Sequence, residues 1–137
     1  MRIFFDSSAF AKRYVYERGT DAVLACCDRA SEIVMSIVAL PEVVSALCSL
    51  NREKKITEQQ YRQLKDAFLA DIEDAAICDL TPSVLANSIE ALESSLLRSM
   101  DAIHVGSALS FECDLFVSAD QRQCEAARRA GLRVERV

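Results

Sequence analysis

Short apolar runs alternate with segments of helical periodicity along almost the whole chain, and this alternation most constrains the fold. The apolar runs end at polar or turn-forming residues, which is typical of buried strands. The segments between them place apolar side chains three and four residues apart, which indicates amphipathic helices. Because strands that alternate with helices form parallel sheets covered on both faces, we expect a three-layer α/β/α fold with a central, mainly parallel sheet.

The expected elements follow from the apolar runs, the capping residues and the turn residues. The strands are predicted at Arg2–Phe5, Ile33–Ser36, Ala75–Leu80, Leu115–Ser118 and Arg133–Val137. The helices are predicted at Ser8–Glu17 with Gly19 as its end, through Val23 and Leu24, from Pro41, from Thr57, from Thr81, over Met100–Phe111 with Ser99 as N-cap, and over Asp120–Ala130. No Pro-, Gly- or Ser-rich linker divides the chain, so we expect residues 1–137 to form a single domain.

Composition and charge exclude several classes of protein. The formal net charge of -5 argues against a simple basic nucleic-acid-binding module. It leaves a nucleic-acid enzyme possible, because carboxylates that hold metal ions make the bare protein negative and present a positive face once loaded. No segment has the ~18 uninterrupted apolar residues of a membrane span. Asp6 comes too early for a secretory signal, so a cytoplasmic protein without membrane contact is expected.

The six cysteines do not indicate a disulfide or zinc framework. They are even in number, but a secretory signal is lacking and the apolar content is ample for a core. No C-x-x-C pair occurs, and the single histidine completes no zinc set of known spacing. Most of these thiols lie in apolar runs and are expected to pack as small core side chains.

Four acidic residues stand where a parallel sheet would bring them to one edge. Asp6 directly follows the first strand, and Asp120 follows the fourth by two residues. Glu42 lies in the first turn after the second strand, and Asp101 begins the apolar helix. Ligands bind beyond the carboxyl ends of the strands in open sheets of this kind. These carboxylates could therefore converge at one end of the fold.

Each of the four acids also has a purely structural interpretation. Asp6 and Asp120 could be helix N-caps, and Gln123 three residues after Asp120 resembles a capping box. Glu42 could have no role beyond complementing the helix dipole. Asp101 is harder to explain in this way, because a charge beside an apolar helix is costly to bury unless it is paired or bound to a cation.

Taken together, the acids favour a metal site. Two carboxylates ~4 Å apart repel by about 4 kcal/mol at an effective dielectric of 20, so a cluster of four requires protons or cations. Mg²⁺ or Mn²⁺ prefers such oxygen ligands. We expect Asp6 and Asp101 to be direct ligands, with Asp120 and Glu42 acting through water, at a second metal, or on the attacking water. A site of this kind suits phosphodiester hydrolysis.

The residues around the four acids resemble the PIN-domain family, and most closely its VapC-like toxins of type II toxin–antitoxin systems. The resemblance rests on four motifs in order and on the closing segment Ala126–Leu132: Phe5-Asp6-Ser7-Ser8-Ala9, Ser36-Ile37-Val38-Ala39-Leu40-Pro41-Glu42-Val43, Met100-Asp101-Ala102-Ile103-His104 and Ser118-Ala119-Asp120-Gln121-Arg122. It covers essentially the whole chain.

The resemblance implies a PIN-like α/β/α fold and endonucleolytic cleavage of RNA with Mg²⁺ or Mn²⁺. It implies that Asp6, Glu42, Asp101 and Asp120 are the catalytic and metal-binding acids. It also implies a homodimer and a cognate antitoxin protein whose C-terminal segment occupies the active-site groove. The family often has Thr where this chain has Ser118, and Ser118 and Ser7 could orient neighbouring carboxylates by hydrogen bonds. A PIN-type nuclease that processes RNA without being a toxin is the alternative.

Four further residues admit a functional interpretation beside a structural one. His104 shares the helix face of Asp101 and could be a base or could hold a carboxylate, but a core histidine bonded to a neighbour is the commoner case, so it is left out of the catalytic set. Lys12, Arg13 and Arg122 are close in sequence to Asp6 and Asp120 and could contact RNA phosphates. Solvated surface charge is the alternative.

Two other functions compete with a nuclease. Receiver domains and haloacid phosphatases also gather acids at strand ends. The phosphatases need a second Asp two residues after the first, where this chain has Ser8, and the early paired acids and late lysine of a receiver are not evident. The second competitor is a non-enzymatic module whose acidic groove receives a basic peptide. Metal-dependent turnover separates it from the nuclease.

Overall fold

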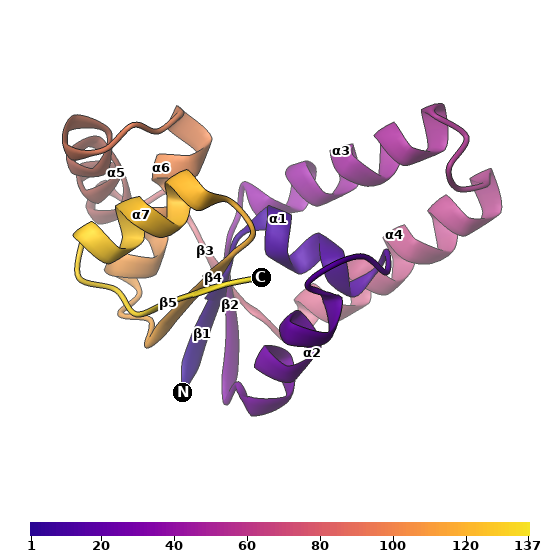
Figure 1. The fold of residues 1–137 in the computed structure, drawn as a ribbon, viewed down its shortest axis with the longest axis horizontal. Helices are drawn as coiled ribbons and strands as arrows, with labels where there is room; N and C mark the ends of the chain where they lie inside the picture. The colour runs from indigo at the N-terminus through magenta and orange to yellow at the C-terminus, as the bar shows by residue number, and fades with distance from the viewer.

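The computed structural model describes every residue from Met1 to Val137. A single sheet of five parallel strands lies at its centre, in the order β3-β2-β1-β4-β5 (Figure 1). The strands are β1 (Arg2–Phe5), β2 (Glu32–Ser36), β3 (Ala76–Cys78), β4 (Leu115–Ser118) and β5 (Val134–Arg136). The expectation of a mainly parallel sheet is confirmed.

The helices lie in two layers, one on each face of the sheet (Figure 1). The first layer contains α1 (Ser7–Phe10), a 3₁₀ turn (Ala11–Arg13), α2 (Thr20–Arg29), α3 (Ala39–Arg52) and α4 (Glu58–Glu73). The second layer contains α5 (Pro82–Ser94), α6 (Ser99–Ser110) and α7 (Gln121–Arg129). No helix combines the length and the apolar character needed to span a bilayer.

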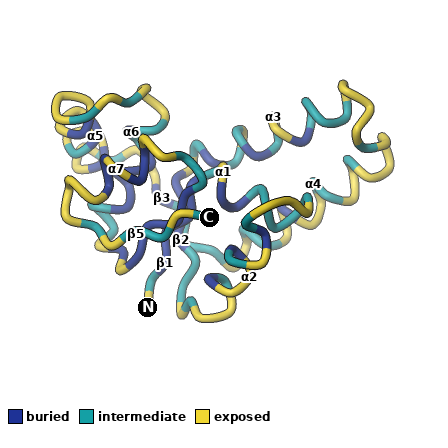
Figure 2. The backbone as a smooth tube through the Cα atoms, viewed as in Figure 1, coloured by how far each residue is buried: buried dark blue, intermediate teal, exposed yellow.

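Strand β1 shows how the sheet divides the interior into two cores. Ile3 and Phe5 pack with the first helical layer, whereas Phe4 packs with the second. This division follows from the alternation of side chains along a strand. All three side chains are fully buried, and the dark centre of Figure 2 follows the strands. The expected continuous apolar runs are therefore those of strands buried on both faces.

The order of the strands creates a crevice between β1 and β4. The chain moves from β1 to β2 and β3 in one direction, and then places β4 and β5 on the other side of β1. Right-handed crossovers that run in opposite directions place their helices on opposite faces of the sheet. The connection that follows β1 therefore covers one face of the sheet, and the connection that follows β4 covers the other. Ligands bind at the carboxyl ends of strands beside such a switch point. Asp6 follows β1 and Asp120 follows β4 at this edge.

The single helix predicted over Ser8–Glu17 is wrong. Helix α1 ends at Phe10 and continues only as the 3₁₀ turn. The hydroxyl of Thr20 donates to the Lys12 carbonyl oxygen at 2.8 Å and thereby takes an acceptor from the helical ladder. Gly19, expected to end that helix, instead precedes α2 as its N-cap, in the left-handed conformation that favours glycine.

The start of α6 also differs from the prediction. Ser99 was expected to be the N-cap, but it is the first helical residue, and Arg98 is an N-cap without a side-chain hydrogen bond. The first turn is not enclosed, because Met100 is 48% exposed. Burial on all sides begins at Ala102 and reaches its fullest extent between His104 and Ala108. The apolar pattern therefore located the helix correctly, but the buried part of the helix is shorter than predicted, because it starts only at Ala102.

Helices α5 and α6 approach so closely at Gly106 that no side chain fits there. A Cβ atom on Gly106 would lie 2.3 Å from Ser88 Oγ and 2.7 Å from the Val84 carbonyl oxygen. We predict that Gly106→Ala lowers the free energy of unfolding by about 1–3 kcal/mol, although alanine is the better helix former. Urea denaturation measures this change.

The matched control for this prediction is the neighbouring position on α6. The Ser107 hydroxyl is buried without a hydrogen-bond partner, so Ser107→Ala removes an unsatisfied group and should leave stability equal or higher. Equal stability of the Gly106→Ala variant and the wild type would contradict the close helix contact.

Candidate active site

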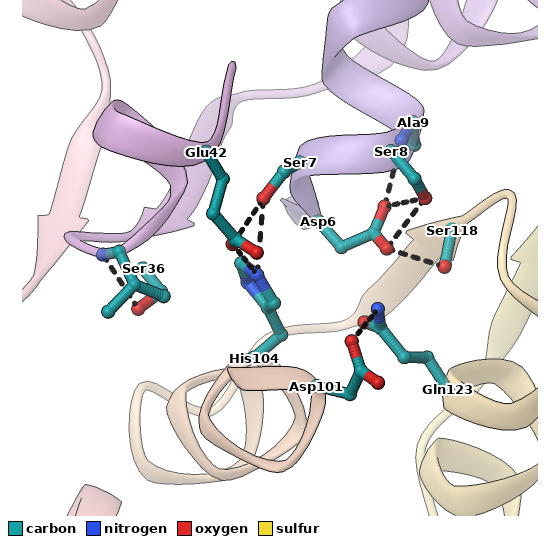
Figure 3. Close-up of polar contacts among 11 residues, drawn as sticks. Asp6, Ser7, Ser8, Ala9, Ser36, Glu42, Asp101, His104, Ser118 and Gln123 are labelled. Atoms are coloured by element: carbon teal, nitrogen blue, oxygen red, sulfur yellow. Dashed lines mark hydrogen bonds and ion pairs between the residues drawn. The ribbon is translucent and has the colours of Figure 1, made fainter. Parts of the chain in front are cut away.

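Asp6 is a completely buried carboxylate at the end of β1. It is the N-cap of α1 and accepts a hydrogen bond from the Ala9 amide at 2.9 Å. The Ser8 hydroxyl lies 2.7 Å from its Oδ2 atom and 2.9 Å from Oδ1, and the Ser118 hydroxyl donates to Oδ2 at 2.7 Å. Figure 3 shows these partners around the carboxylate. The cap interpretation of Asp6 thus holds.

The electrostatics of Asp6 go beyond those of an ordinary cap. Burial raises the pKa of Asp6, although nearby His104 and the hydrogen bonds to the carboxylate act in the opposite direction. A carboxylate that is costly to ionise in its own pocket is stabilised by any cation that reaches it. This is a common property of functional sites.

Ser118 links Asp6 to Asp120 across the crevice. Its hydroxyl donates to Asp6 and accepts a hydrogen bond from the Asp120 amide at 2.9 Å. The Asp120 carboxylate caps α7 by accepting from the Gln123 amide at 3.0 Å. The end of β4 and the start of α7 are thereby fixed relative to β1. The suggestion that Ser118 orients a neighbouring carboxylate is consistent with this geometry.

Asp101 lies opposite Asp120, in the first turn of α6. The side-chain amide of Gln123 donates to its carboxylate at 3.0 Å. Burial and, next, the negative charge of Asp120 raise the pKa of Asp101. Gln123 therefore contacts both acids, through its side chain and its backbone. It does not use its side chain to complete the capping box suggested by the sequence, and its Oε1 atom is buried without a partner.

Asp101 and Asp120 line the same cavity, which has a volume of about 730 Å³. The cavity lies between the N-terminal ends of α6 and α7 and the segment that follows α5. Eight of its nine lining residues are polar or charged. The nine residues are Ser95, Leu96, Arg98, Asp101, Asp120, Gln121, Arg122, Glu125 and Arg129.

Glu42 belongs to a separate hydrogen-bonded group. Its carboxylate accepts from the Ser7 hydroxyl at 2.6 Å and lies 2.6 Å from His104 Nε2 (Figure 3). Burial raises the pKa of Glu42, but the hydrogen bonds from His104 and Ser7 outweigh it, so the pKa is lowered overall. Ser7 therefore orients Glu42 and not its neighbour Asp6. His104, 1% exposed, is the core histidine bonded to a neighbour that the sequence favoured.

The four predicted acids thus lie at one edge of the sheet in distinct settings. Asp101 and Asp120 face one cavity, Asp6 is joined to the Asp120 amide through Ser118, and Glu42 faces His104. No three His, Cys, Asp or Glu side chains lie close enough together to hold a metal ion.

Three residues that contribute to this edge were not predicted from the sequence: Ser8, Arg98 and the side chain of Gln123. Only the polar character of Gln123 on an otherwise buried helix face could have indicated its role.

Two of the three basic residues considered as RNA contacts form ion pairs with acids outside the cavity. Lys12 forms an ion pair with Glu17 at 3.0 Å, and Arg13 forms one with Asp71 at 3.1 Å. Arg122, in contrast, lines the cavity with the acids. For Lys12 and Arg13 the structure thus favours the alternative of ordinary structural charge.

The raised pKa of Asp101 leads to a prediction about stability. An acid whose pKa is higher in the folded state weakens that state as pH rises through this pKa. Asp101→Asn keeps the acceptor for Gln123 and removes the charge. In EDTA, the variant should unfold with a free energy equal to or above that of the wild type at pH 7, and the difference should shrink toward pH 4. Urea denaturation at both pH values measures it. A loss of stability at pH 7 would contradict the prediction.

The chain is similar to known proteins over almost its whole length. The PIN domain family model matches residues 3–129. Ribonuclease VapC45 of Mycobacterium tuberculosis (strain CDC 1551 / Oshkosh) is 35% identical in an alignment of 138 residues, and the alignment spans 96% of this chain and 93% of that protein.

Two solved structures share the fold. Mycobacterium tuberculosis VapC20, described as a sarcin-ricin loop cleaving toxin, has a TM-score of 0.69 at 16% identity and covers 98% of this chain and 99% of its own. A toxin-antitoxin complex from Klebsiella pneumoniae has a TM-score of 0.67 at 12% identity, with 88% of each chain covered. The match to the family model over residues 3–129 and the 35% identical relative show that this chain belongs to the PIN-domain family.

Proposed function

We propose that residues 1–137 form a single-domain, metal-dependent endoribonuclease that acts as the toxin of a type II toxin–antitoxin pair in the cytoplasm. The observation that carries the proposal is the pair of carboxylates, Asp101 and Asp120, that share one polar cavity beside the switch point of the sheet. The 35% identical relative is named a ribonuclease, which supports RNA as the substrate.

The residues at this edge fit a hard divalent ion in their chemistry. Asp101 and Asp120 offer carboxylate oxygens to one cavity. Burial and the charge of Asp120 raise the pKa of Asp101, so a cation would stabilise its ionised form and relieve the repulsion between the two acids. The buried Gln123 Oε1 is an oxygen without a partner at the same place. Mg²⁺ and Mn²⁺ prefer such oxygens. Asp101 and Asp120 would hold the ion as its two protein ligands, with water in its other positions, because no third acid lies close enough to bind it. Asp6 would act indirectly, through Ser118, which joins it to the Asp120 amide.

Each protein group has a defined task in this proposal. When bound, the ion lowers the pKa of a water molecule and offsets negative charge on the phosphate. Gln123 holds Asp101 in position, while Ser118 fixes Asp6 relative to the start of α7. The shared cavity brings the phosphodiester to Asp101 and Asp120. The rate gain then comes from positioning and from charges fixed in advance.

Glu42 has a different role in the proposal. Its hydrogen bonds to Ser7 and His104 keep it ionised and directed away from the Gln123 group. Ser7 follows Asp6 directly, and His104 lies one helical turn after Asp101. Glu42 would therefore act on the attacking water or steady these two segments, with His104 as a positioning residue.

The first test of this proposal removes single carboxylates. Asp101→Asn and Asp120→Asn should each lower the rate of cleavage of a labelled, mixed-sequence RNA in Mg²⁺ by at least about 100-fold, because one fixed charge at a reacting centre contributes on this scale. EDTA should abolish cleavage by the wild type. Gel electrophoresis of the RNA products measures the rate.

Glu125→Gln is the matched control for these variants. Glu125 lines the same cavity and accepts a hydrogen bond from the Gln121 side chain at 3.0 Å, so its loss removes the same charge without touching the proposed metal ligands. Cleavage by this variant should stay within about threefold of the wild type. Undiminished cleavage by both Asp variants would overturn the assignment.

We propose an antitoxin and a second copy of the chain as protein partners. The similar toxin-antitoxin complex supports the first. The surface of α5 supports the second, because it exposes an apolar row at helical spacing: Leu85, Ile89, Leu92 and, just beyond the helix, Leu96, with exposed fractions of 44, 55, 40 and 77%. A twofold interface pairs one patch with its own copy, and an antiparallel contact of two such rows sets Leu85 of one copy against Leu96 of the other.

The dimer has a direct test. Ile89→Glu places a charge in the centre of the row and should convert a dimer into a monomer in sedimentation velocity at micromolar concentration. Asn87→Glu adds the same charge on another face of α5 and should leave the dimer intact. A wild type that sediments as a monomer would show that this row does not join two copies.

A further inference from the structure

Arg98 and Arg122 bring two positive charges to the cavity that Asp101, Asp120 and Glu125 also line. Both line it, both are exposed, and neither is part of any ion pair in the structure. Arg98 is the N-cap of α6, three residues before Asp101, and Arg122 is the second residue of α7, two residues after Asp120. The helix ends that position the acids therefore also position these two cations.

Other cations near this edge are already engaged. Lys12 and Arg13 pair with acids outside the cavity. Arg129 also lines the cavity, but its guanidinium donates to the Ser94 carbonyl oxygen and lies 3.4 Å from Ser95 Oγ, which ties the end of α5 to α7. Arg98 and Arg122 are thus the two arginines of the cavity whose guanidinium groups have no hydrogen-bond partner in the protein.

The remaining walls define the chemistry of a ligand for these two cations. Ser95 and Gln121 add neutral polar groups, and Leu96 is the single apolar residue. Glu125 adds a carboxylate, which accepts a hydrogen bond from the Gln121 side chain at 3.0 Å. A guanidinium binds phosphate through two parallel N–H···O bonds. The whole chain carries a net charge of -5, so it offers no general attraction for a polyanion. Affinity for RNA then has to come from local cations.

We propose that Arg98 and Arg122 bind the phosphate groups of the RNA strand on either side of the phosphodiester that is cleaved. This inference rests on the proposed ribonuclease function and identifies the strand-binding residues of that same site. The two guanidinium groups hold the strand in the cavity so that the reacting phosphate meets Asp101 and Asp120. They are positioning residues, because they contact phosphates that do not react.

The test measures RNA binding apart from cleavage. A fluorescent, mixed-sequence 12-nucleotide single-stranded RNA is titrated in EDTA with wild type and with R98Q/R122Q, at several KCl concentrations. Removal of two phosphate contacts should lower the slope of log affinity against log salt by about 1.4, because each contact on a single strand contributes about 0.7. Affinity at low salt should fall by about 10- to 100-fold, the scale of two charge-assisted hydrogen bonds.

Two further variants separate position from charge. R52Q/R133Q removes two exposed arginines outside the cavity and should keep the salt slope of the wild type. R98K/R122K keeps both charges and should restore the slope. In Mg²⁺, R98Q/R122Q should raise KM for the same RNA with kcat within about threefold of the wild type, which a folding defect would not produce.

The outcomes separate this inference from the function on which it rests. A wild type that binds but cleaves nothing, together with a reduced slope in R98Q/R122Q, supports the binding residues and overturns the nuclease. A wild type that cleaves, together with R98Q/R122Q behaving like R52Q/R133Q, overturns the inference and keeps the nuclease. If RNA binding is unchanged while affinity for a labelled polyglutamate peptide falls, the two arginines serve an acidic protein segment, and the assignment to RNA is overturned.

Discussion

The buried carboxylate of Asp6 is the constraint on which the rest of the site depends. It ends the central strand β1 and is held by the Ala9 amide and by hydroxyls from Ser8 and Ser118. The Ser118 bond ties β1 to β4, the two strands whose connections diverge at the switch point. Burial raises the pKa of Asp6, so the fold bears a cost for ionising this carboxylate that an apolar side chain in its place would not impose. A cost of this kind in a core is usual for a functional site and unusual for a cap alone.

Much of the fold could be predicted from local chemistry. The apolar strands are short and buried on both faces, and the caps at Thr57 and Thr81 begin α4 and α5 as expected. The errors arose where tertiary contacts overrule local pattern. The helix expected to reach Glu17 ends early because Thr20, a residue beyond it, takes a backbone acceptor. Helix α6 begins one residue earlier than expected, because Arg98 takes the N-cap position without a side-chain hydrogen bond and Ser99 is already helical.

The position of the four acids in the fold could be predicted, but not their grouping. Strand ends and the order of the motifs predicted that all four lie at the carboxyl edge of the sheet, because that edge follows from the sequence pattern. Which acid faces which partner depends on side-chain directions at distances of many residues. His104 lies 62 residues from Glu42, and Gln123 lies 22 residues from Asp101. Local signals therefore suggested a capping box for Gln123, while the fold uses the same side chain to hold Asp101.

The distribution of charge explains how an acidic chain can serve a polyanionic substrate. The carboxylates of the cavity oppose RNA binding, so the arginines beside them have to supply the attraction, and a bound cation would add to it. Arg98 and Arg122 flank that space from the helix ends that carry Asp101 and Asp120, which keeps cation and anion at a fixed relative position. A movement of α6 relative to α7 would therefore shift Arg98 and Asp101 together, relative to Arg122 and Asp120. The close contact at Gly106 holds α6 against α5, and the guanidinium of Arg129 joins α5 to α7. The packing of this helical layer thus sets the geometry of the site.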